Sequence, residues 1–281
     1  MTITDLSGMA RMTEEEYRKY PAVNKSTLWE MHKSPAHYKW ALEHPKEDTP
    51  ALAFGRALHM AVLQPMEFAN HYRLAPNCDR RTKAGKDEYS GFIQSLRADQ
   101  EPISPDDYTT IIGMIGSIMT FPAAHDLLNH AETEVPLFWV DDATGLECKC
   151  RTDAMVFETD DDGEITGVTI IDLKTCSDAS TQAFMRDSLR YGYDVQAAHY
   201  VRAVKHLVPD VPVRWGFLAI EKAEPYCTNL IWVEEDFLDR GTLQLIGLMD
   251  KLKTCMDTDT WPAYGENTLI LPEWAALPED E

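Results

Sequence analysis

The sequence predicts a mixed α/β fold, in which a β-sheet core is flanked by helices and preceded by a mainly helical N-terminal region. Two observations carry this prediction. Up to about residue 130 the apolar residues recur at helical spacing, whereas β-rich segments separated by turn-forming stretches begin near residue 132. From there the expected order is three strands, a helix, two strands and a helix, which is typical of a sheet covered by helices.

The N-terminal region is expected to consist of consecutive helices. Asn24 or Ser26 can cap one of them, Pro35 begins a new helix within it, and Ser104-Pro105 supplies the cap and first turn of another. A polar, basic connection precedes the fourth helix. The expected helices are Thr13–Tyr20, Lys25–His44, Ala51–Leu63, Asp87–Ala98 and Ser104–Thr120, and the connection is Cys78–Lys86.

The second half of the chain carries the predicted sheet. The expected strands are Glu134–Val140, Glu147–Phe157, Val168–Lys174, Val213–Glu221 and Tyr226–Val233. One long helix is expected from Asp187 or Ser188 to Val208, another from Glu235 to Asp257, and an irregular aromatic tail over Trp261–Trp274. We expect a single domain over residues 1–281, with a helical part over 1–130, a mixed α/β core over 131–260 and a tail over 261–281.

Composition limits the class of protein. With 281 residues, 44% of them hydrophobic, the chain can bury a full core. The net charge of −21 argues against a protein that coats nucleic acid nonspecifically, but allows an enzyme with a locally basic channel. No apolar run of about 18 residues and no signal-peptide core occur, so a cytoplasmic protein with no membrane partner is expected. The six cysteines show no secreted-domain spacing and are expected to be reduced.

The most informative motif is Asp172-Leu173-Lys174, preceded 19 residues upstream by Asp153. Strand side chains alternate between faces, so Asp172 and Lys174 project from the same side. Two carboxylates can hold Mg²⁺, and a lysine, its pKa lowered by burial, can orient or deprotonate a water for phosphodiester cleavage. The alternatives are a solvent-facing Asp153 and a structural Asp172–Lys174 ion pair at the strand end.

Three further residues have the chemistry to complete such a site. His59 shares a helix face with Gly55, which allows close approach of a ligand, and a neutral imidazole can bind a metal, preferably Mn²⁺. Gln196 and Tyr200 lie four residues apart and share a helix face. The alternatives are an ordinary core or surface histidine, and a polar stripe beside a core tyrosine.

Two other clusters in the sequence have chemistry of their own. The densest basic patch of this acidic chain is either a solvated loop or a phosphate-gripping arch, and consists of Arg80, Arg81, Lys83 and Lys86. Cys148-x-Cys150 has no matching pair at zinc-ligand spacing, so we interpret it as core, although a structural zinc site is the alternative.

Taken together, these motifs resemble those of the RecE-type exonucleases (exonuclease VIII) of phages and prophages. That family belongs to the RecB-like branch of the PD-(D/E)XK nuclease superfamily. The resemblance extends over nearly the whole chain, and its motifs are Asn24-Lys25-Ser26-Thr27-Leu28, Ser34-Pro35-Ala36-His37-Tyr38, Gly55-Arg56-Ala57-Leu58-His59, Asp79–Lys86, Cys150-Arg151-Thr152-Asp153, Asp172-Leu173-Lys174-Thr175, Gln196–Tyr200, Trp261-Pro262-Ala263-Tyr264 and Leu271-Pro272-Glu273-Trp274.

The resemblance implies a PD-(D/E)XK (restriction-endonuclease-like) fold and a role for each motif residue. It implies that His59, Asp153, Asp172 and the Leu173 backbone carbonyl bind a divalent metal, Mg²⁺ or in its place Mn²⁺. Lys174 would position or activate water, and Glu134 would be an additional acid. Gln196 and Tyr200 would orient DNA. Asp172 stands where much of the superfamily carries Glu, but a shorter carboxylate still reaches a metal at about 2.0–2.1 Å.

The resemblance also implies an activity and partners. They are 5′→3′ digestion of linear double-stranded DNA from its ends, a homo-oligomeric ring, and a single-strand-annealing recombinase as partner. The alternatives are a RecB-like nuclease of other polarity or endonuclease mode, and a non-catalytic DNA-binding protein of the same fold.

Overall fold

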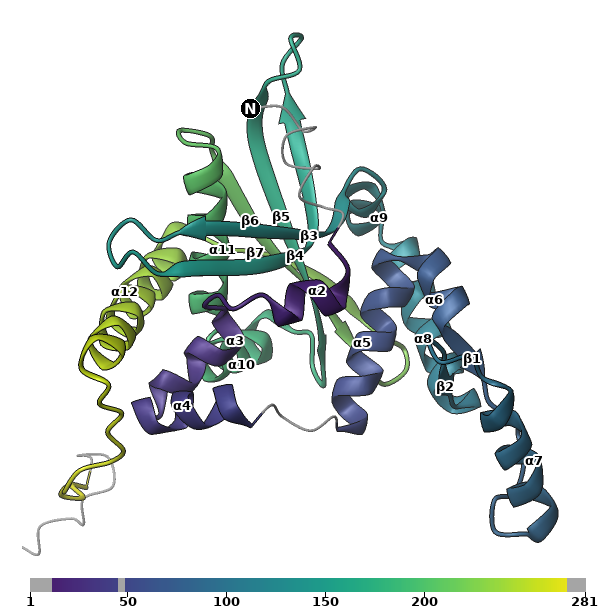
Figure 1. The fold of residues 1–281 in the computed structure, drawn as a ribbon. Helices are drawn as coiled ribbons and strands as arrows, with labels where there is room; N and C mark the ends of the chain where they lie inside the picture. Colours follow the sequence, from purple (N-terminus) through teal and green to yellow (C-terminus); the bar gives the residue numbers. More distant parts are fainter. Residues whose placement is uncertain (1–11, 45–48, 272–281) are drawn as a thin grey trace, which may run out of the picture.

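A computed structural model of the chain describes residues 12–44 and 49–271. Its centre is a five-stranded sheet of order β3-β4-β5-β6-β7, in which β5 and β6 are parallel and the other neighbours are antiparallel. Figure 1 shows this sheet crossing the middle of the molecule. The strands are β3 (Glu132–Val140), β4 (Glu147–Thr159), β5 (Ile165–Cys176), β6 (Val213–Glu221) and β7 (Thr228–Trp232).

Helices cover both faces of the sheet, because its central strands are apolar on both sides. In β6, Trp215 and Phe217 pack into one core cluster, while Leu218 and Ile220 pack into the other. The first cluster includes residues of α3 (Lys25–Leu28), the 3-10 helix η1 (Trp29–His32), α11 (Tyr193–Leu207) and α12 (Glu235–Thr258). The second includes residues of α5 (Pro50–Leu63) and α8 (Pro105–Thr120).

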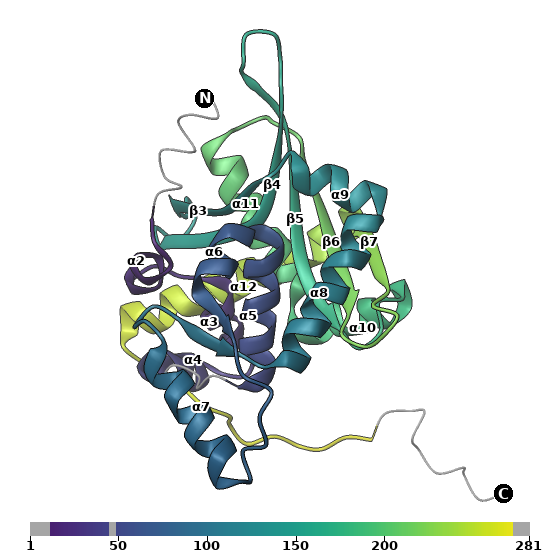
Figure 2. The same ribbon diagram turned by 90° about the vertical axis from the view of Figure 1, so that its right-hand side faces the viewer.

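The N-terminal region contains further elements. They are α2 (Glu14–Lys19), α4 (Pro35–Glu43), α6 (Pro65–His71), α7 (Lys83–Ser95), α9 (Pro122–Asn129) and a two-stranded parallel sheet of β1 (Tyr72–Leu74) and β2 (Glu101–Ile103). Helices α4, α5, α6, α8 and α9 all begin with proline, whose fixed φ and missing N–H suit the first turn. In Figures 1 and 2, α7 lies at the end of an arm that projects from the sheet.

Several elements differ from the sequence prediction. Helices α6 and α9 and the two-stranded sheet of β1 and β2 were not expected. Helix α7 begins at Lys83, inside the expected connection, because the Thr82 hydroxyl accepts a hydrogen bond from Gly85 N and caps it. The expected long helix is two helices, α10 (Thr181–Tyr191) and α11, since Gly192 has a φ of +65° and ends α10 as its left-handed C-cap.

The tail is irregular over residues 261–271, as expected, and Pro272–Trp274 lie outside the described residues. Among the described residues no single helix is both long and apolar enough to cross a bilayer, although α8 and α9, bent by 95°, pass that test of length and composition as a pair. All six cysteines are free thiols, as expected.

Candidate active site

The candidate site lies at a fork between two strands of the sheet. Antiparallel pairing of β4 with β5 extends to Ala154 opposite Ile171. Beyond this point β4 continues beside β3, while β5 continues beside β6 from Asp172 onward. The two strands therefore separate where the sequence places Asp153 on one and Asp172 on the other.

The Asp153 carboxylate fills part of this gap. Its Oδ2 accepts a hydrogen bond of 2.7 Å from Leu173 N, so it replaces a backbone partner that β4 no longer offers. The same oxygen lies 3.5 Å from His59 Nδ1 on α5. Asp153 is therefore held from two elements, and the solvent-facing interpretation of this residue is wrong: its side chain is 15% exposed.

Three potential metal ligands meet beside the fork. One ligand atom from each of His59, Glu134 and Asp153 lies within 4.8 Å of the other two. Glu134 adopts a φ of +54°, a conformation that non-glycine residues seldom take and that is often retained at functional sites. Imidazole with two carboxylates is a donor set that suits Mn²⁺ and Mg²⁺. The residues present therefore fit a divalent metal.

Asp172 does not join that group among the described residues. It is 2% exposed, and forms an ion pair with Lys174 while accepting a 2.6 Å hydrogen bond from Gln196 Nε2. The Lys174 ammonium also lies 4.8 Å from the ring centroid of Tyr193. Gln196 and Tyr193 come from α11, on the face of the sheet opposite α5, so side chains from both layers converge on the fork.

Burial and crowded charges shift the pKa values of these groups. Burial raises the pKa of Asp172, and the Asp153 charge adds to this effect. Burial and the charge of Asp153 raise the pKa of Glu134 to about 7. Burial also opposes ionisation of Asp153, but His59, Lys174 and the Leu173 N–H outweigh it and lower that pKa. A bound cation would relieve the repulsion between these carboxylates.

The structure corrects one expectation about Lys174. Burial alone would lower its pKa, as the sequence suggested, but the charges of Asp172 and Asp153 outweigh burial, so its pKa is raised. Lys174 is thus a fixed cation that can orient a phosphate or a water, and in this state it is not poised to take up a proton.

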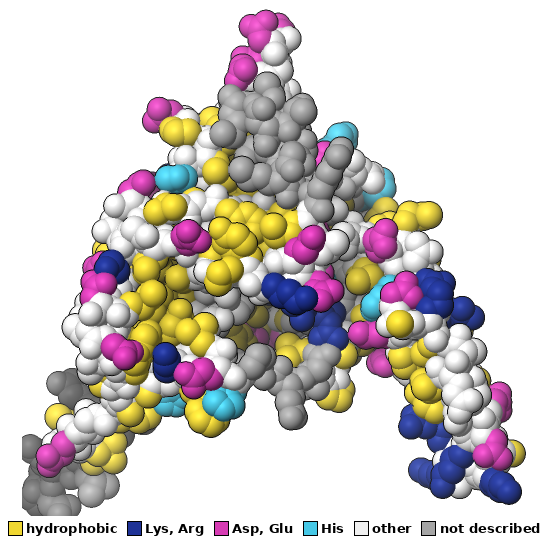
Figure 3. Space-filling view, in the orientation of Figure 1, with side chains coloured by type: hydrophobic (Ala, Val, Ile, Leu, Met, Phe, Trp, Pro, Cys, Tyr) yellow, Lys and Arg dark blue, Asp and Glu magenta, His cyan; other side chains and the backbone are white. Residues whose placement is uncertain are grey.

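The other predicted residues lie on α11, at the start of α7 and on β4. Tyr200 on α11 packs its ring edge-on against Trp215 at 5.6 Å, and burial raises its pKa well above the usual value. The patch Arg80, Arg81, Lys83 and Lys86 lies at the start of α7, on the projecting arm, and Figure 3 shows basic side chains gathered there. Cys148 and Cys150 are core residues, and neither joins a metal-ligand group in the described ranges.

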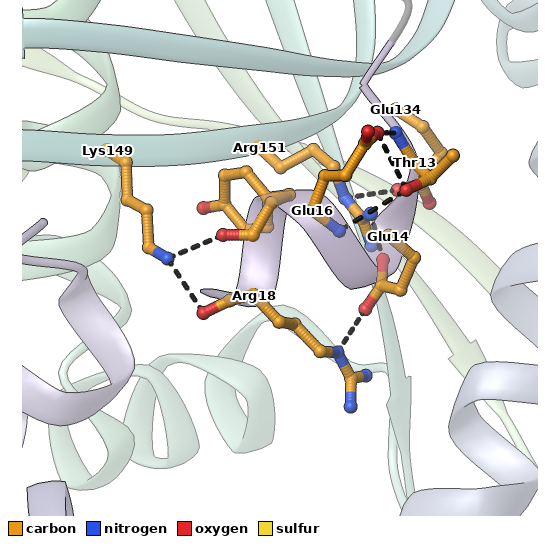
Figure 4. A network of polar contacts seen from close by, with 8 residues as sticks. Thr13, Glu14, Glu16, Arg18, Glu134, Lys149 and Arg151 are labelled. Atoms are coloured by element: carbon orange, nitrogen blue, oxygen red, sulfur yellow. Dashed lines mark hydrogen bonds and ion pairs between the residues drawn. The ribbon is translucent and has the colours of Figure 1, made fainter. Parts of the chain in front are cut away.

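Arg151 is a site residue that the sequence interpretation missed as a functional group. It lies two positions before Asp153 on β4, and its Nε lies 2.7 Å from Glu134 Oε2. Figure 4 shows it between Glu134 and helix α2. The available signal was its place two residues from Asp153, on the same face of the strand.

Comparisons with known proteins agree with this architecture. A protein from Eubacterium rectale described as a "putative exonuclease" has a solved structure that superposes with a TM-score of 0.57, at 15% identity over 87% of each chain. A second solved structure, SSO0001, is 16% identical over 72% of this chain and 87% of its own, but it superposes poorly, with a TM-score of 0.28. No curated protein matches the sequence.

The sequence of residues 24–271 matches the PDDEXK-like domain of unknown function (DUF3799). This match and the mixed five-stranded sheet flanked by helices confirm the predicted fold class, that of the PD-(D/E)XK superfamily. The chain therefore belongs to the PDDEXK-like family DUF3799.

Proposed function

We propose that the protein is a metal-dependent deoxyribonuclease, and that it is an exonuclease of the RecE type. In this proposal it degrades linear double-stranded DNA 5′→3′ and leaves 3′ single-stranded tails for recombination. The observation that carries the nuclease proposal is the strand fork, where the carboxylates of Asp153 and Asp172 and the ammonium of Lys174 come together. The likeness to a protein described as a "putative exonuclease" supports the exonuclease mode.

His59, Glu134 and Asp153 would hold the metal, since their ligand atoms already lie together. When bound, a divalent metal supplies Lewis acidity toward the phosphate and makes water easier to deprotonate. We propose Mg²⁺ as the natural ion, with Mn²⁺ as a substitute. The Leu173 carbonyl is a further proposed ligand, because the N–H and C=O of a strand residue face the same edge, here the gap at the fork. Asp172 is another proposed ligand, because its carboxylate lies at the same fork.

The other residues position the reacting groups. Lys174, held by Asp172 and Tyr193, would place its fixed charge against the phosphate or the attacking water. Gln196 fixes the Asp172 carboxylate through its 2.6 Å hydrogen bond, so we assign it a positioning role. Tyr200 would support the same helix face behind Gln196.

The test is digestion of linear and circular duplexes labelled at either end, with Mg²⁺, Mn²⁺ or EDTA. We expect the 5′ label to be released first from linear duplex, circular duplex to survive, and EDTA to abolish cleavage. Early release of the 3′ label would indicate the opposite polarity, and cutting of circles an endonuclease. Duplex binding without cleavage in either metal would contradict the nuclease proposal and favour a non-catalytic DNA-binding protein.

We also propose that the basic arm contacts the DNA backbone away from the fork. Arg80 lies over the Tyr89 ring at 4.1 Å, and these two residues line a hollow together with Lys86. Figure 3 shows the surface hollowed between this arm and the body of the molecule. In a chain of net charge −21, such a local cluster is where phosphate contacts are expected.

Replacing Lys83 and Lys86 together by Gln should weaken duplex binding and flatten its salt dependence. Each lost phosphate contact lowers the slope of log affinity against log salt concentration by about 0.9. The matched control replaces Lys205 and Lys251, which are exposed elsewhere, and should leave that slope unchanged. Equal slopes in the two double variants, measured by fluorescence anisotropy, would contradict a role for the arm.

Domain organisation and partners complete the proposal. Residues of α5 and α8 share a core cluster with β5 and β6, which supports a single nuclease domain over residues 1–281. The proposed partners are double-stranded DNA ends, further copies of the chain in a ring, and a single-strand-annealing recombinase.

A further inference from the structure

The guanidinium of Arg151 lies between two carboxylates from different parts of the chain. One is Glu134 on β3, whose Oε2 lies 2.7 Å from Arg151 Nε. The other is Glu14 on α2, which forms an ion pair with a terminal nitrogen of Arg151. Figure 4 shows Arg151 between Glu14 on the helix and Glu134 on the strand. The Arg151 guanidinium is therefore paired with one acid through Nε and with another through a terminal nitrogen.

The two acids are not equivalent. Glu134 is 14% exposed and belongs to the metal-ligand group, so its carboxylate has a role in that group besides its contact with Arg151. Glu14 is 45% exposed and lies on a six-residue surface helix. An exposed ion pair contributes little stability, so the Glu14–Arg151 contact is the weaker of the two.

The helix that carries Glu14 is attached to the sheet at its other end. Lys149, which is 4% exposed, donates hydrogen bonds of 2.6 and 2.7 Å to the carbonyl oxygens of Tyr17 and Tyr20. The ammonium also lies 4.7 Å from the Tyr17 ring centroid. The C-terminal end of α2 is thus fixed by a buried cation, while Glu14 at the N-terminal end meets Arg151 through a half-exposed pair.

An arginine in this place suits a DNA phosphate. Its charge is permanent and its planar fork pairs with a phosphate in the same geometry as with a carboxylate. Arg151 is two residues from Asp153 on the same strand, and its Nε contacts the acid that shares a ligand group with Asp153 and His59. If a phosphate of a DNA strand reached the ligand group of His59, Glu134 and Asp153, a neighbouring phosphate oxygen of the DNA would be brought toward Arg151.

We propose that Arg151 binds a phosphate of the DNA strand at the cleavage site, and that Glu14 holds this position as a phosphate-like carboxylate until DNA displaces it. The inference rests on the proposed nuclease function, which it deepens by naming a substrate-binding residue and an internal competitor. When Glu14 is displaced, Glu134 remains in the metal-ligand group. Helix α2 also stays attached to the sheet through Lys149.

The test compares Glu14→Gln with Glu15→Gln. Both remove one negative charge and one i,i+4 ion pair from the same helix, Glu14 with Arg18 and Glu15 with Lys19, but Glu15 is 77% exposed and only Glu14 also pairs with Arg151. Binding of a short fluorescein-labelled duplex is measured by anisotropy in EDTA, where no cleavage occurs. We expect Glu14→Gln to lower Kd roughly two- to fivefold more than Glu15→Gln does.

Two further variants separate competition from general effects. Glu14→Asp keeps the charge and the helix but shortens the side chain, so it should also lower Kd, whereas Glu15→Asp should not. In an Arg151→Lys background, binding should be weaker and the gain from Glu14→Gln should vanish. With metal present, Glu14→Gln should lower KM for duplex cleavage and leave kcat nearly unchanged.

The outcomes distinguish the two proposals. If wild-type protein binds and cuts duplex but Glu14→Gln behaves like Glu15→Gln, the internal competitor is refuted while the nuclease stands. If the gain persists with Arg151→Lys, Arg151 is not the phosphate site. If the wild-type protein neither binds nor cuts DNA with Mg²⁺ or Mn²⁺, the proposed function fails, and this inference with it.

Discussion

Replacing Asp153 by Asn is expected to reduce cleavage of linear duplex by about 10²- to 10⁴-fold while the fold survives. An asparagine oxygen can still accept the hydrogen bond from Leu173 N, so the structural contact at the fork is retained. The negative charge that faces His59 and the proposed metal is lost. Activity on end-labelled duplex and the midpoint of urea unfolding are measured side by side.

The matched control for this prediction is Asp142→Asn. Asp142 is 86% exposed and lies 3.5 Å from His206, away from the strand fork. This variant should retain the activity and stability of the wild-type protein. Wild-type activity in Asp153→Asn would remove Asp153 from the catalytic assignment.

Replacing Lys174 by Met is expected to lower both activity and stability. Asp172, only 2% exposed, would lose the cation that compensates its charge, and breaking a buried pair in this way costs about 3–5 kcal/mol. Cleavage should fall by about 10²-fold or more, because the fixed cation beside the reacting phosphate is gone. Urea unfolding in EDTA measures the stability of the metal-free protein.

The companion variant and the pH dependence separate the two effects. Burial holds the pKa of Asp172 above its usual value of 3.8, and loss of Lys174 raises it further. In Lys174→Met the folded state therefore binds the proton more tightly, so the penalty disappears below about pH 4 and grows as pH rises. Adding Asp172→Asn should restore stability at neutral pH but not activity. Recovery of activity in the double variant would contradict a catalytic role for this pair.

Local signals in the sequence predicted most of the fold. The run of apolar and aromatic residues in β6 and the cap at Ser104-Pro105 were sufficient, because each depends on residues close together in the chain. The break at Gly192 was harder to predict. A glycine is tolerated within a helix, and here it ends one because the chain turns where the Trp29 ring leaves no space for a side chain. Contact with a residue so distant in sequence leaves no local pattern.

The residue types of the site could be predicted from the sequence, but the pKa shifts and ion-pair partners of its charged groups could not. The sequence pointed to Asp153, Asp172 and Lys174, and the structure brings them to one fork. The direction of the Lys174 pKa depends on how two carboxylates balance burial, which spacing does not reveal. Arg151 was missed for a similar reason, since its partners Glu14 and Glu134 are brought to it by tertiary contacts.

The fork between β4 and β5 also gives the protein an intrinsic spectroscopic reporter. The amide of Leu173 donates to the Asp153 carboxylate at a position where, in a continuous sheet, it would donate to a backbone carbonyl. Its ¹H–¹⁵N resonance is therefore sensitive to whatever the carboxylate binds. Occupancy of the centre can thus be followed at one backbone nucleus, without a substrate and without altering any side chain.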